Sequence, residues 1–234
     1  MVKTDKIYEG KAKILYATGN PDYLIQHFKD DATAFDATKR GKIVEKGICN
    51  NHISAKIFQL LEKKGISTHF VKLLNDREML IKKVQIIPIE VTMRNIVAGG
   101  MSKLLGLEEG IALESPVLEY HYKEDKLHDP LVNDYHILAL KIATKRELDE
   151  IKDCSFRIND VLKDFFVQRN LILVDFKLEF GRYKDKVILA DEISPDTCRL
   201  WDKDTKEKLD KDRFRRDLGG VEDAYQEVLK RVLN

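Results

Sequence analysis

The chain has 234 residues, 43% of them hydrophobic and 35% charged, so it can bury a core as one large domain or two close lobes. Its 41 basic and 40 acidic side chains give a net charge of +1, which offers no support for nucleic-acid binding through bulk charge. The three widely spaced cysteines match no zinc site or disulfide framework, and no signal peptide or membrane span is evident, so we expect a cytoplasmic protein.

The first 86 residues are predicted to be rich in strands around one helix. Asn51 is a suitable N-cap for a helix with apolar residues at helical spacing, and Gly65 is placed to end it. Pro88 is expected to end the regular structure of this region. Strands are expected over residues 6–16, with a turn at 9–11, and over 69–74 and 79–87.

The remainder of the chain mixes helices and strands. Thr144 and Glu147 have the spacing of a capping box, and Ser155 is expected to cap the next helix. The other expected elements are a strand over 89–95, a short helix within 98–110 and a final helix over 221–233. This order is typical of an α+β fold. We expect two lobes, 1–86 and 87–234, with a ligand cleft between them.

The most informative segment is a predicted hairpin that spans residues 171–191. Successive side chains on a strand face opposite sides. One face would be apolar and would comprise Ile172, Val174, Phe176, Leu178 and Phe180. The other would carry Asp175, Lys177 and Glu179, with Asp191 near the end of the second strand. Because buried acids need partners or a metal, the pattern suggests a divalent cation. The alternative is a surface hairpin whose charges are solvated.

The register of this hairpin decides which acids meet. If residues of like parity pair, a tight turn places Asp175 opposite Asp191, and a looser turn places Glu179 opposite Asp191. Either register crowds carboxylates together, and Mg²⁺ would relieve their repulsion. Mg²⁺ typically binds one or two carboxylates together with nucleotide phosphates.

Two segments have the composition of phosphate-binding loops. Tyr8–Lys13 places one glycine and two lysines at a turn between strands, although an ordinary basic hairpin is the favoured explanation of this segment taken alone. Arg94–Gly100 runs from a polar strand end into small residues and a helix, with a structural turn as the alternative. Lys82 and Lys83 are within plausible reach of a nucleotide, but most lysine pairs are solvated.

Further candidates lie near the acids of the hairpin. Asp196 and Arg199 follow its second strand and are candidate substrate contacts, while 211–216 adds cations or begins a solvated helix. The acidic loop 129–134 is another candidate for a metal or substrate contact. The histidines lack metal-ligand spacing, and no Ser–His–Asp or Cys–His pairing supports covalent catalysis. Together these features predict phosphoryl transfer from a nucleotide.

Eight motifs resemble, in order, those of the SAICAR synthetase family: YEGKAK, DDATAFD, KGICNN, EVTMRNIVAGG, DPLVND, LVDFKLEFG, ADEISPDTCRLWD and DKDRFRRDLGG. The resemblance runs from Lys6 to the C-terminus, and the length is similar to that of the single-function bacterial type. It implies kinase-like or ATP-grasp-like lobes and a homodimer. It also implies an ATP- and Mg²⁺-dependent ligase of purine biosynthesis, with small-molecule substrates and no nucleic-acid or membrane partner. That ligase joins L-aspartate to the carboxylate of 5-aminoimidazole ribonucleotide carboxylate (CAIR), giving SAICAR, ADP and phosphate.

The resemblance also implies roles for residues of this chain. ATP would contact Gly10, Lys11, Ala12, Lys13, Lys82 and Ile86. Mg²⁺ would bind Glu179 and Asp191, and Asp175 and Lys177 would line the reaction centre with help from Lys11 and Lys13. The substrate nucleotide would contact Arg94, Arg199 and Arg215, and the segments 31–36 and 46–51 would form the aspartate pocket.

One departure from the family pattern and two rival functions remain. Gly100 stands where many relatives have serine, and a backbone N–H or Ser102 is expected to replace that hydroxyl. A small-molecule kinase would share the nucleotide site without requiring an amine. A regulatory nucleotide-binding protein would also share it, but regulation gives no reason for the full set of carboxylates.

Overall fold

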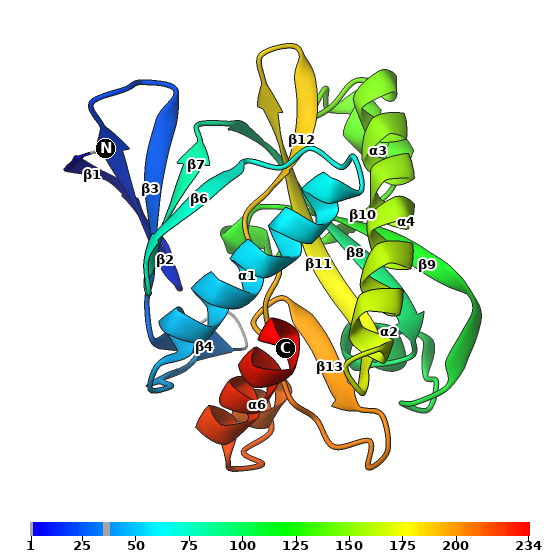
Figure 1. Ribbon diagram of the computed structural model, residues 1–234. Coiled ribbons are helices and arrows are strands. Elements are labelled where there is room, and N and C mark those ends of the chain that lie inside the picture. The colour runs from blue at the N-terminus through cyan, green and yellow to red at the C-terminus, as the bar shows by residue number, and fades with distance from the viewer. Residues whose placement is uncertain (1, 35–37) are drawn as a thin grey trace.

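Five antiparallel strands form the first sheet of the computed structural model, which describes residues 2–34 and 38–234. Its strand order is β1 (Lys3–Glu9), β2 (Lys13–Thr18), β3 (Tyr23–Phe28), β7 (Glu78–Lys82) and β6 (Phe70–Asn75). A separate ribbon pairs β4 (Asp31–Ala34) with β5 (Lys39–Lys42). In Figure 1, the five-stranded sheet lies beside a second, larger sheet.

The second sheet is built on two long central strands. Its order is β10 (Leu131–Val132), β9 (Ala112–Tyr122), β8 (Gln85–Ile96), β11 (Leu171–Tyr183) and β12 (Lys186–Ala190). A further strand, β13 (Cys198–Asp202), pairs with the beginning of β11, whereas β12 pairs with its end. Strand β11 is therefore flanked by β8 on one side and by β12 and β13 on the other.

Helices cover both sheets. Their bounds are α1 (Lys46–Lys63), α2 (Gly99–Leu105), α3 (Asp134–Ala139), α4 (Lys145–Val167), α5 (Asp212–Arg215) and α6 (Val221–Leu233), with a 3-10 helix η1 (Asp125–Leu127). Helix α1 packs on β3, β6 and α6, and α4 packs on β8 and β11 (Figure 1). The predicted mixed α+β class is confirmed. Within the described ranges, no helix is both long and apolar enough to cross a membrane.

Two helix starts differ from the prediction. The capping box of Thr144 and Glu147 is confirmed at the start of α4, but no new helix begins at Ser155. The Ser155 hydroxyl instead donates to the Ile151 carbonyl at 2.7 Å, one turn earlier, so α4 continues without a break. Helix α1 begins at Lys46, and Asn51 lies inside it rather than at its N-cap.

Pro88 lies inside β8 and does not end regular structure, contrary to the prediction. The register between β8 and β11 shifts at this point, between the pairs of Glu90 and of Ile86, so the missing N–H of proline breaks no regular ladder. The boundary predicted at 86/87 also falls inside β8. One hydrophobic core contains Phe28, residues of α1 and α4, and residues of both sheets. The division into two lobes stays a prediction.

Candidate active site

The hairpin of β11 and β12 closes through a two-residue turn, Lys184 and Asp185. Lys184 has a φ of 54°, in the left-handed region that such tight turns use. This turn pairs residues of unlike parity and places Glu179 opposite Ala190. Both predicted registers, with Asp175 or Glu179 opposite Asp191, are therefore wrong. The length of the turn sets the pairing of the two strands, and it places Asp191 opposite neither residue.

A bulge in β11 also changes which side chains share a face. The pairing with β13 shifts between Leu173 and Asp175. Ile172 and Val174 consequently pack with Trp201 in a small cluster, whereas Phe176, Leu178 and Phe180 join the main core. The single apolar face predicted for these five side chains is wrong for the first two, because a bulge inserts one extra residue and reverses the alternation.

The ammonium group of Lys177 lies close to the acids of the hairpin, even though the predicted pairing of the two hairpin strands is wrong. Its Nζ lies 2.6 Å from Glu179 Oε1, 2.9 Å from Glu90 Oε1 and 3.6 Å from Asp191 Oδ2. Asp191 directly follows β12 and has a φ of 62°, which takes it out of strand geometry. The carboxylates of Glu179 and Asp191 thus border the same ammonium group.

Lys13 reaches the same acids from the first sheet. Its Nζ contacts the carboxylate of Asp191 and lies 3.2 Å from Glu192 Oε1. Burial alone would lower the pKa of Lys13, but Asp191 and Glu192 raise it above its usual range. Burial would likewise raise the pKa of Asp191, but Lys13 and Lys177 hold it well below the usual range. Both groups are therefore charged at neutral pH.

Lys123, on the segment after β9, completes this charge cluster. Its Nζ lies 2.6 Å from Glu179 Oε1. Among the residues that the structure describes, the cluster has four carboxylates and three ammonium groups: Glu90, Glu179, Asp191, Glu192, Lys13, Lys123 and Lys177. The excess of negative charge suits a cation.

Arg94, Asp175 and Arg199 lie side by side on three neighbouring strands. Asp175 pairs with Arg94 of β8 and with Arg199 of β13 in the strand register. Asp175 Oδ2 accepts from Arg94 Nη1 at 2.7 Å and from Arg199 Nη1 at 2.9 Å. The buried carboxylate therefore fixes both guanidinium groups in place. Asp212, on α5, similarly accepts from Arg199 Nε at 3.0 Å and from Arg215 Nη1 at 2.6 Å.

Asp196 is held by residues from two helices. Its Oδ2 lies 2.6 Å from Nζ of Lys46 on α1, and its Oδ1 accepts from the Tyr225 hydroxyl of α6 at 2.6 Å. Lys46 and Tyr225 are both fully buried. An isolated buried lysine is costly, so this pair ties the loop that carries Asp196 to the core.

These groups line two adjoining cavities. The large cavity, of about 1040 Å³, is bordered by Gly10, Lys11, Ala12, Lys13, Lys82, Ile86, Lys177, Glu179 and Asp191, and Asp129 of the acidic loop also reaches it. The small cavity, of about 330 Å³, is bordered by Lys11, Arg94, Asp175, Lys177, Asp196, Arg199, Lys211 and Arg215. All the residues assigned to ATP, Mg²⁺, the reaction centre and the substrate nucleotide border one of the two cavities, whereas Lys83 borders neither. Their roles stay predictions.

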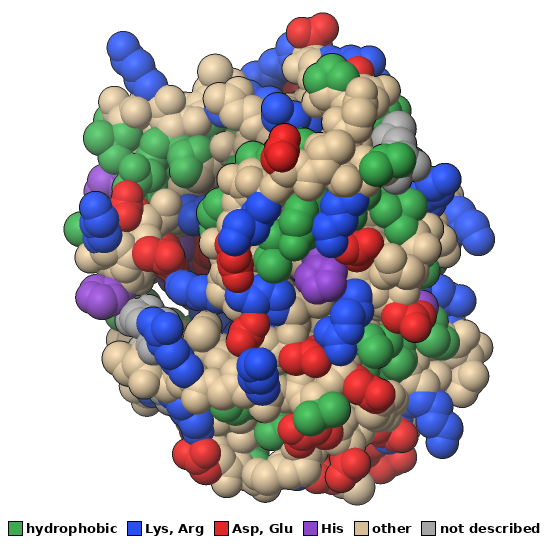
Figure 2. Space-filling model, turned by 90° about the vertical axis from the view of Figure 1, so that its left-hand side faces the viewer, with side chains coloured by type: hydrophobic (Ala, Val, Ile, Leu, Met, Phe, Trp, Pro, Cys, Tyr) green, Lys and Arg blue, Asp and Glu red, His purple; other side chains and the backbone are tan. Residues whose placement is uncertain are grey.

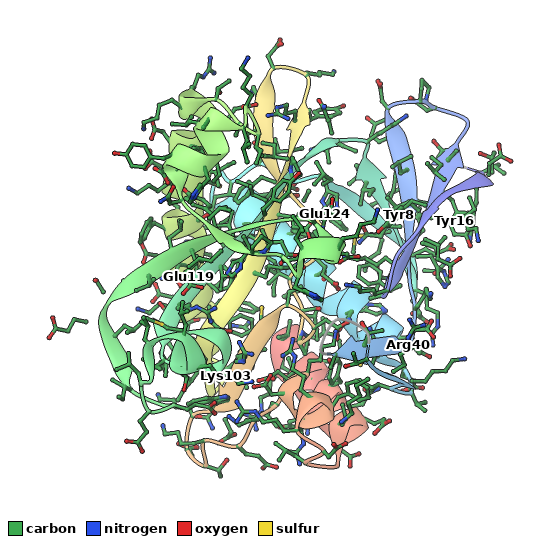
Figure 3. The ribbon with its side chains drawn as sticks, turned by 180° about the vertical axis from the view of Figure 1, so that it is seen from behind. Tyr8, Tyr16, Arg40, Lys103, Glu119 and Glu124 are labelled. Carbon is green, nitrogen blue, oxygen red and sulfur yellow. The ribbon has the colours of Figure 1, made fainter. Side chains whose placement is uncertain are left out.

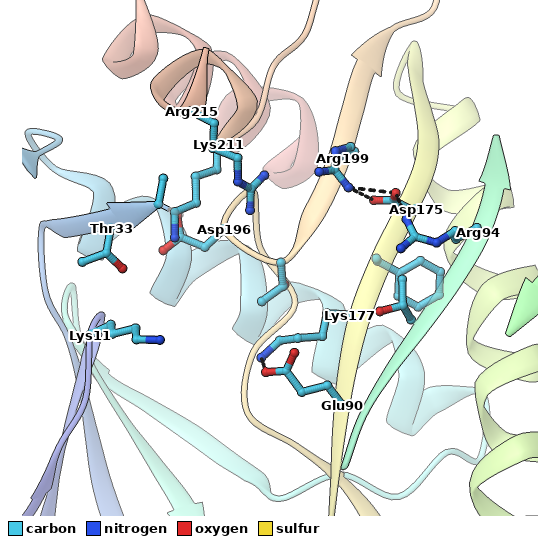
Figure 4. Close-up of a pocket in the computed structure, with 14 residues that line it drawn as sticks. Lys11, Thr33, Glu90, Arg94, Asp175, Lys177, Asp196, Arg199, Lys211 and Arg215 are labelled. Atoms are coloured by element: carbon cyan, nitrogen blue, oxygen red, sulfur yellow. Dashed lines mark hydrogen bonds and ion pairs between the residues drawn. The ribbon is translucent and has the colours of Figure 1, made fainter. Parts of the chain in front are cut away.

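Lys11 and Lys177 border both cavities from opposite sides. In Figure 4, Lys11 comes from the first sheet, while Lys177 and Glu90 come from the second. Lys11 Nζ also lies 2.9 Å from Asp125 Oδ1 of η1, which links the β1–β2 turn to the second sheet. In Figure 3, Glu124, the N-cap residue of η1, lies on the side of the second sheet nearer to Tyr8 of β1. On the face seen in Figure 2, basic and acidic side chains are interspersed, in keeping with the net charge.

Glycines at the start of α2 bring the backbone close to the arginines. Gly99 has a φ of 55°, and a Cβ there would lie 2.4 Å from Arg199 Nη2. A Cβ on Gly100 would lie 3.7 Å from Arg94 Nη2, an ordinary contact, so the position has room for the serine of the family pattern. The Ser102 hydroxyl donates to the Leu107 carbonyl at 2.7 Å and is thus already engaged.

The segments assigned to the aspartate pocket are only partly defined. Thr33 and Ala34 border the small cavity, whereas Phe35 and Asp36 lie outside the described residues. The 46–51 segment forms the first turns of α1, where Lys46 contacts Asp196. The role of both segments in binding aspartate stays a prediction.

Sequence reasoning missed Lys123 and Glu192 as members of the site, and it placed Lys46 in the segment assigned to the aspartate pocket without its pairing to Asp196. Lys123 approaches Glu179 through the β8–β9 register, which has no local sequence signal. Glu192 follows Asp191 directly, and strict alternation would have sent it to the other side. Lys46 pairs with Asp196, which lies 150 positions later, so this contact has no local sequence signal either.

The donor set suits a magnesium ion that is shared with phosphates. Within residues 2–34 and 38–234, no three acidic, histidine or cysteine side chains form a metal site by themselves. Glu179 and Asp191 supply the one or two carboxylates that Mg²⁺ typically takes from a protein, and both border the large cavity. These residues fit Mg²⁺ when phosphate oxygens complete its coordination.

Comparisons with known proteins agree on one family. Residues 6–232 match the family model described as SAICAR synthetase. The chain is 58% identical to the phosphoribosylaminoimidazole-succinocarboxamide synthase of Caldanaerobacter subterraneus subsp. tengcongensis, over 99% of each chain. The crystal structure of that enzyme from Ehrlichia chaffeensis is 51% identical with a TM-score of 0.96, over 97% of this chain and 98% of that one. A SAICAR synthetase in complex with ADP is 47% identical with a TM-score of 0.93, over 96% of each chain.

Proposed function

Because the chain belongs to the SAICAR synthetase family, we propose that its cleft joins L-aspartate to the carboxylate of CAIR while ATP is converted to ADP and phosphate. Full-length relatives at 55–58% identity carry the synthase name, and a similar structure was solved with ADP. The protein is thus an ATP-dependent carbon–nitrogen ligase of purine biosynthesis.

The nucleotide is assigned to the large cavity. Its walls include Leu15, Leu24 and Ile86, which suit a planar base, together with Lys11 and Lys13, which suit phosphates. Glu179 and Asp191 would hold Mg²⁺ there, and the ion would neutralise charge between the phosphates. The lysines contribute positive charge directly at the transferred group.

CAIR is assigned to the small cavity. It carries a phosphate and a carboxylate, and arginine donates two parallel hydrogen bonds to either group. Arg94 and Arg199 are pre-oriented by Asp175, and Arg215 by Asp212. Lys177 borders both cavities and is therefore placed where the CAIR carboxylate would meet the terminal phosphate of ATP.

The reaction is proposed to pass through an acyl phosphate. A carboxylate oxygen of CAIR attacks the terminal phosphorus, and the bond from that phosphorus to the ADP oxygen breaks. The aspartate amine then attacks the activated carbonyl carbon, phosphate leaves with the former carboxylate oxygen, and the amine gives up a proton. Two adjoining cavities hold the reactants in place, which lowers the entropic barrier.

The observation that carries this proposal is the contact of Lys11 and Lys177 with both cavities. The test is to incubate the protein with ATP, Mg²⁺ and CAIR, with and without aspartate, and to measure ADP and the succinocarboxamide. We expect ADP release that depends on both co-substrates. Release with another phosphate acceptor alone would indicate a kinase, and no release would indicate a nucleotide-binding protein; either outcome would overturn the proposal.

The family resemblance further supports a cytoplasmic homodimer as part of this proposal. Sedimentation velocity on the purified chain tests the dimer, and a single species at the monomer mass of 27.1 kDa would contradict it. Fractionation of cells that express the chain tests the location.

A further inference from the structure

The loop between β12 and β13 connects a wall of the large cavity to a wall of the small one. Glu192 borders the large cavity and Asp196 borders the small one, while Ser194 lies between them in the chain and borders neither. All three residues are buried, and Ser194 is only 1% exposed. Ser194 therefore touches the ligands of neither cavity directly.

The Ser194 hydroxyl joins the two ends of this loop. Its O–H donates to Glu192 Oε2 at 3.1 Å, and its oxygen accepts from the Asp196 backbone N–H at 3.2 Å. A hydroxyl has one donor and two acceptor lone pairs, so both bonds form at once. While these bonds hold, the side chain of Glu192 and the backbone at Asp196 cannot move independently.

At the large cavity, Glu192 is paired with a lysine that is assigned to the phosphates. Its Oε1 lies 3.2 Å from Lys13 Nζ, and Lys13 also contacts the carboxylate of Asp191. The side chains of Lys13 and Glu192 are 15% and 4% exposed, so solvent ions screen this pair weakly. A nucleotide whose phosphates attract Lys13 would therefore also act on Glu192.

At the small cavity, the same loop positions two wall residues. The Asp196 carboxylate contacts Lys46 and Tyr225, each at 2.6 Å. The Pro195 carbonyl accepts from the Lys211 backbone N–H at 3.1 Å. Both Asp196 and Lys211 border the small cavity (Figure 4). A ligand that contacts this wall would thus restrain the loop from its other end.

We propose that Ser194 is a positioning residue that couples the two cavities, so that a nucleotide and CAIR bind more tightly together than alone. This inference rests on the proposed assignment of the nucleotide to the large cavity and of CAIR to the small one. A ligand at either end restrains the loop that carries both ends, so the second ligand loses less conformational freedom when it binds. By linkage, each ligand raises the affinity for the other by the same factor.

The test is calorimetric binding of ADP with Mg²⁺, without and with saturating CAIR, and of CAIR without and with saturating ADP. No turnover occurs, because ADP lacks the transferred phosphate. In the wild-type chain, each ligand should raise the affinity for the other about tenfold, a usual size for coupling between sites. In Ser194→Ala, which removes both bonds, each ligand alone should bind within about threefold of the wild type, while the coupling should fall to about twofold or less.

Ser155→Ala is the matched control, because Ser155 is also a fully buried hydroxyl but lies on α4 and borders neither cavity. It should keep the wild-type coupling. Glu192→Gln is a second variant, which keeps an acceptor for the Ser194 hydroxyl and removes the charge that faces Lys13. The coupling should fall in this variant too.

Three outcomes would overturn this inference: independent binding of ADP and CAIR by the wild-type chain, unchanged coupling in Ser194→Ala, or an equal loss of coupling in Ser155→Ala. Unchanged coupling would mean that the ligands act on each other directly across the adjoining cavities. Should Ser194→Ala fail to fold, unchanged coupling in Glu192→Gln would overturn the inference in the same way. The ligase proposal would survive all of these outcomes, because both ligands still bind. Failure of either ligand to bind would instead refute the assignment of the cavities together with this inference.

Discussion

Asp175 and Arg199 face each other across β11 and β13, and Arg199 Nη1 lies 2.9 Å from Asp175 Oδ2 and 3.1 Å from Oδ1. The guanidinium is thus oriented before any substrate arrives. Its Nε is engaged by Asp212 at 3.0 Å. The remaining donor, Nη2, lies toward Gly99 and is available to an anion held at the start of α2.

Arg199→Lys is expected to raise the Michaelis constant for CAIR about 10- to 100-fold, because lysine keeps the charge but loses the paired hydrogen bonds. The Michaelis constant for ATP should change much less. Steady-state kinetics with each substrate varied in turn checks this. Arg146→Lys, at an exposed position of α4, is the matched control and should change neither. Equal effects on CAIR and ATP would argue against a CAIR contact.

The two glycines at the start of α2 are expected to respond oppositely. Gly99→Ala should destabilise the fold by about 1–2 kcal/mol and raise the Michaelis constant for CAIR, because its φ is positive and a Cβ would displace Arg199. Gly100→Ser should leave stability within about 0.5 kcal/mol and lower that Michaelis constant, because the new hydroxyl adds a donor. Urea unfolding and CAIR kinetics check both variants. A Gly100→Ser variant that is less stable and binds CAIR more weakly than Gly99→Ala would contradict the roles given to the two glycines.

Asp191→Asn is expected to keep the fold and to lose about a hundredfold in ATP turnover, the scale for removal of one preorganised electrostatic group. The fold should survive because Lys13 keeps Glu192 and Lys177 keeps Glu179 as partners. Circular dichroism and ADP release over a range of Mg²⁺ concentrations check this. Asp185→Asn, in the exposed turn of the same hairpin, is the control. Wild-type activity of Asp191→Asn at saturating Mg²⁺ would remove Asp191 from the metal role.

Asp210 predicts a pH dependence of stability. Burial, followed by repulsion from Asp212, raises the pKa of its carboxyl from 3.8 to about 7. Because the folded value exceeds the unfolded one, the contribution of this group is fully present below about pH 4 and is lost as the pH rises through about 7. The loss has a slope of at most about 1.4 kcal/mol per pH unit.

Urea unfolding of the wild-type chain and of Asp210→Asn, at about pH 5 and about pH 7, isolates this effect because other titrating groups largely cancel. The stability of the wild type relative to the variant should fall between the two pH values. A constant difference would show that Asp210 does not titrate in this range.

Local signals in the sequence were sufficient for much of the fold. The capping box of Thr144 and Glu147 and the alternation over 89–95 depend on neighbours within a few residues, and both were predicted correctly. The hairpin register failed because the two-residue turn at Lys184 shifts every pair by one. The apolar face of β11 failed because the bulge after Leu173 leaves no mark in the residue pattern.

Some residues of the site could be recognised from the sequence, and others could not. Acids and a lysine on apolar strands identify β11 as a site strand because their burial requires partners. Lys123 was missed, and the pairing of Lys46 with Asp196 was not predicted, because Glu179 and Asp196 lie far from these lysines in the sequence. Asp191 joins Lys177 through a left-handed backbone conformation, which side-chain alternation does not predict.

The central claim is that the cleft activates the CAIR carboxylate with the terminal phosphate of ATP. Transfer of isotope from CAIR labelled with ¹⁸O in that carboxylate tests it most directly, with mass analysis of the phosphate released during turnover with aspartate. An acyl phosphate requires one labelled oxygen in each phosphate, because the leaving phosphate keeps the oxygen that attacked. Phosphate without label would contradict the account, since ATP would then have transferred its phosphate to water or to another acceptor.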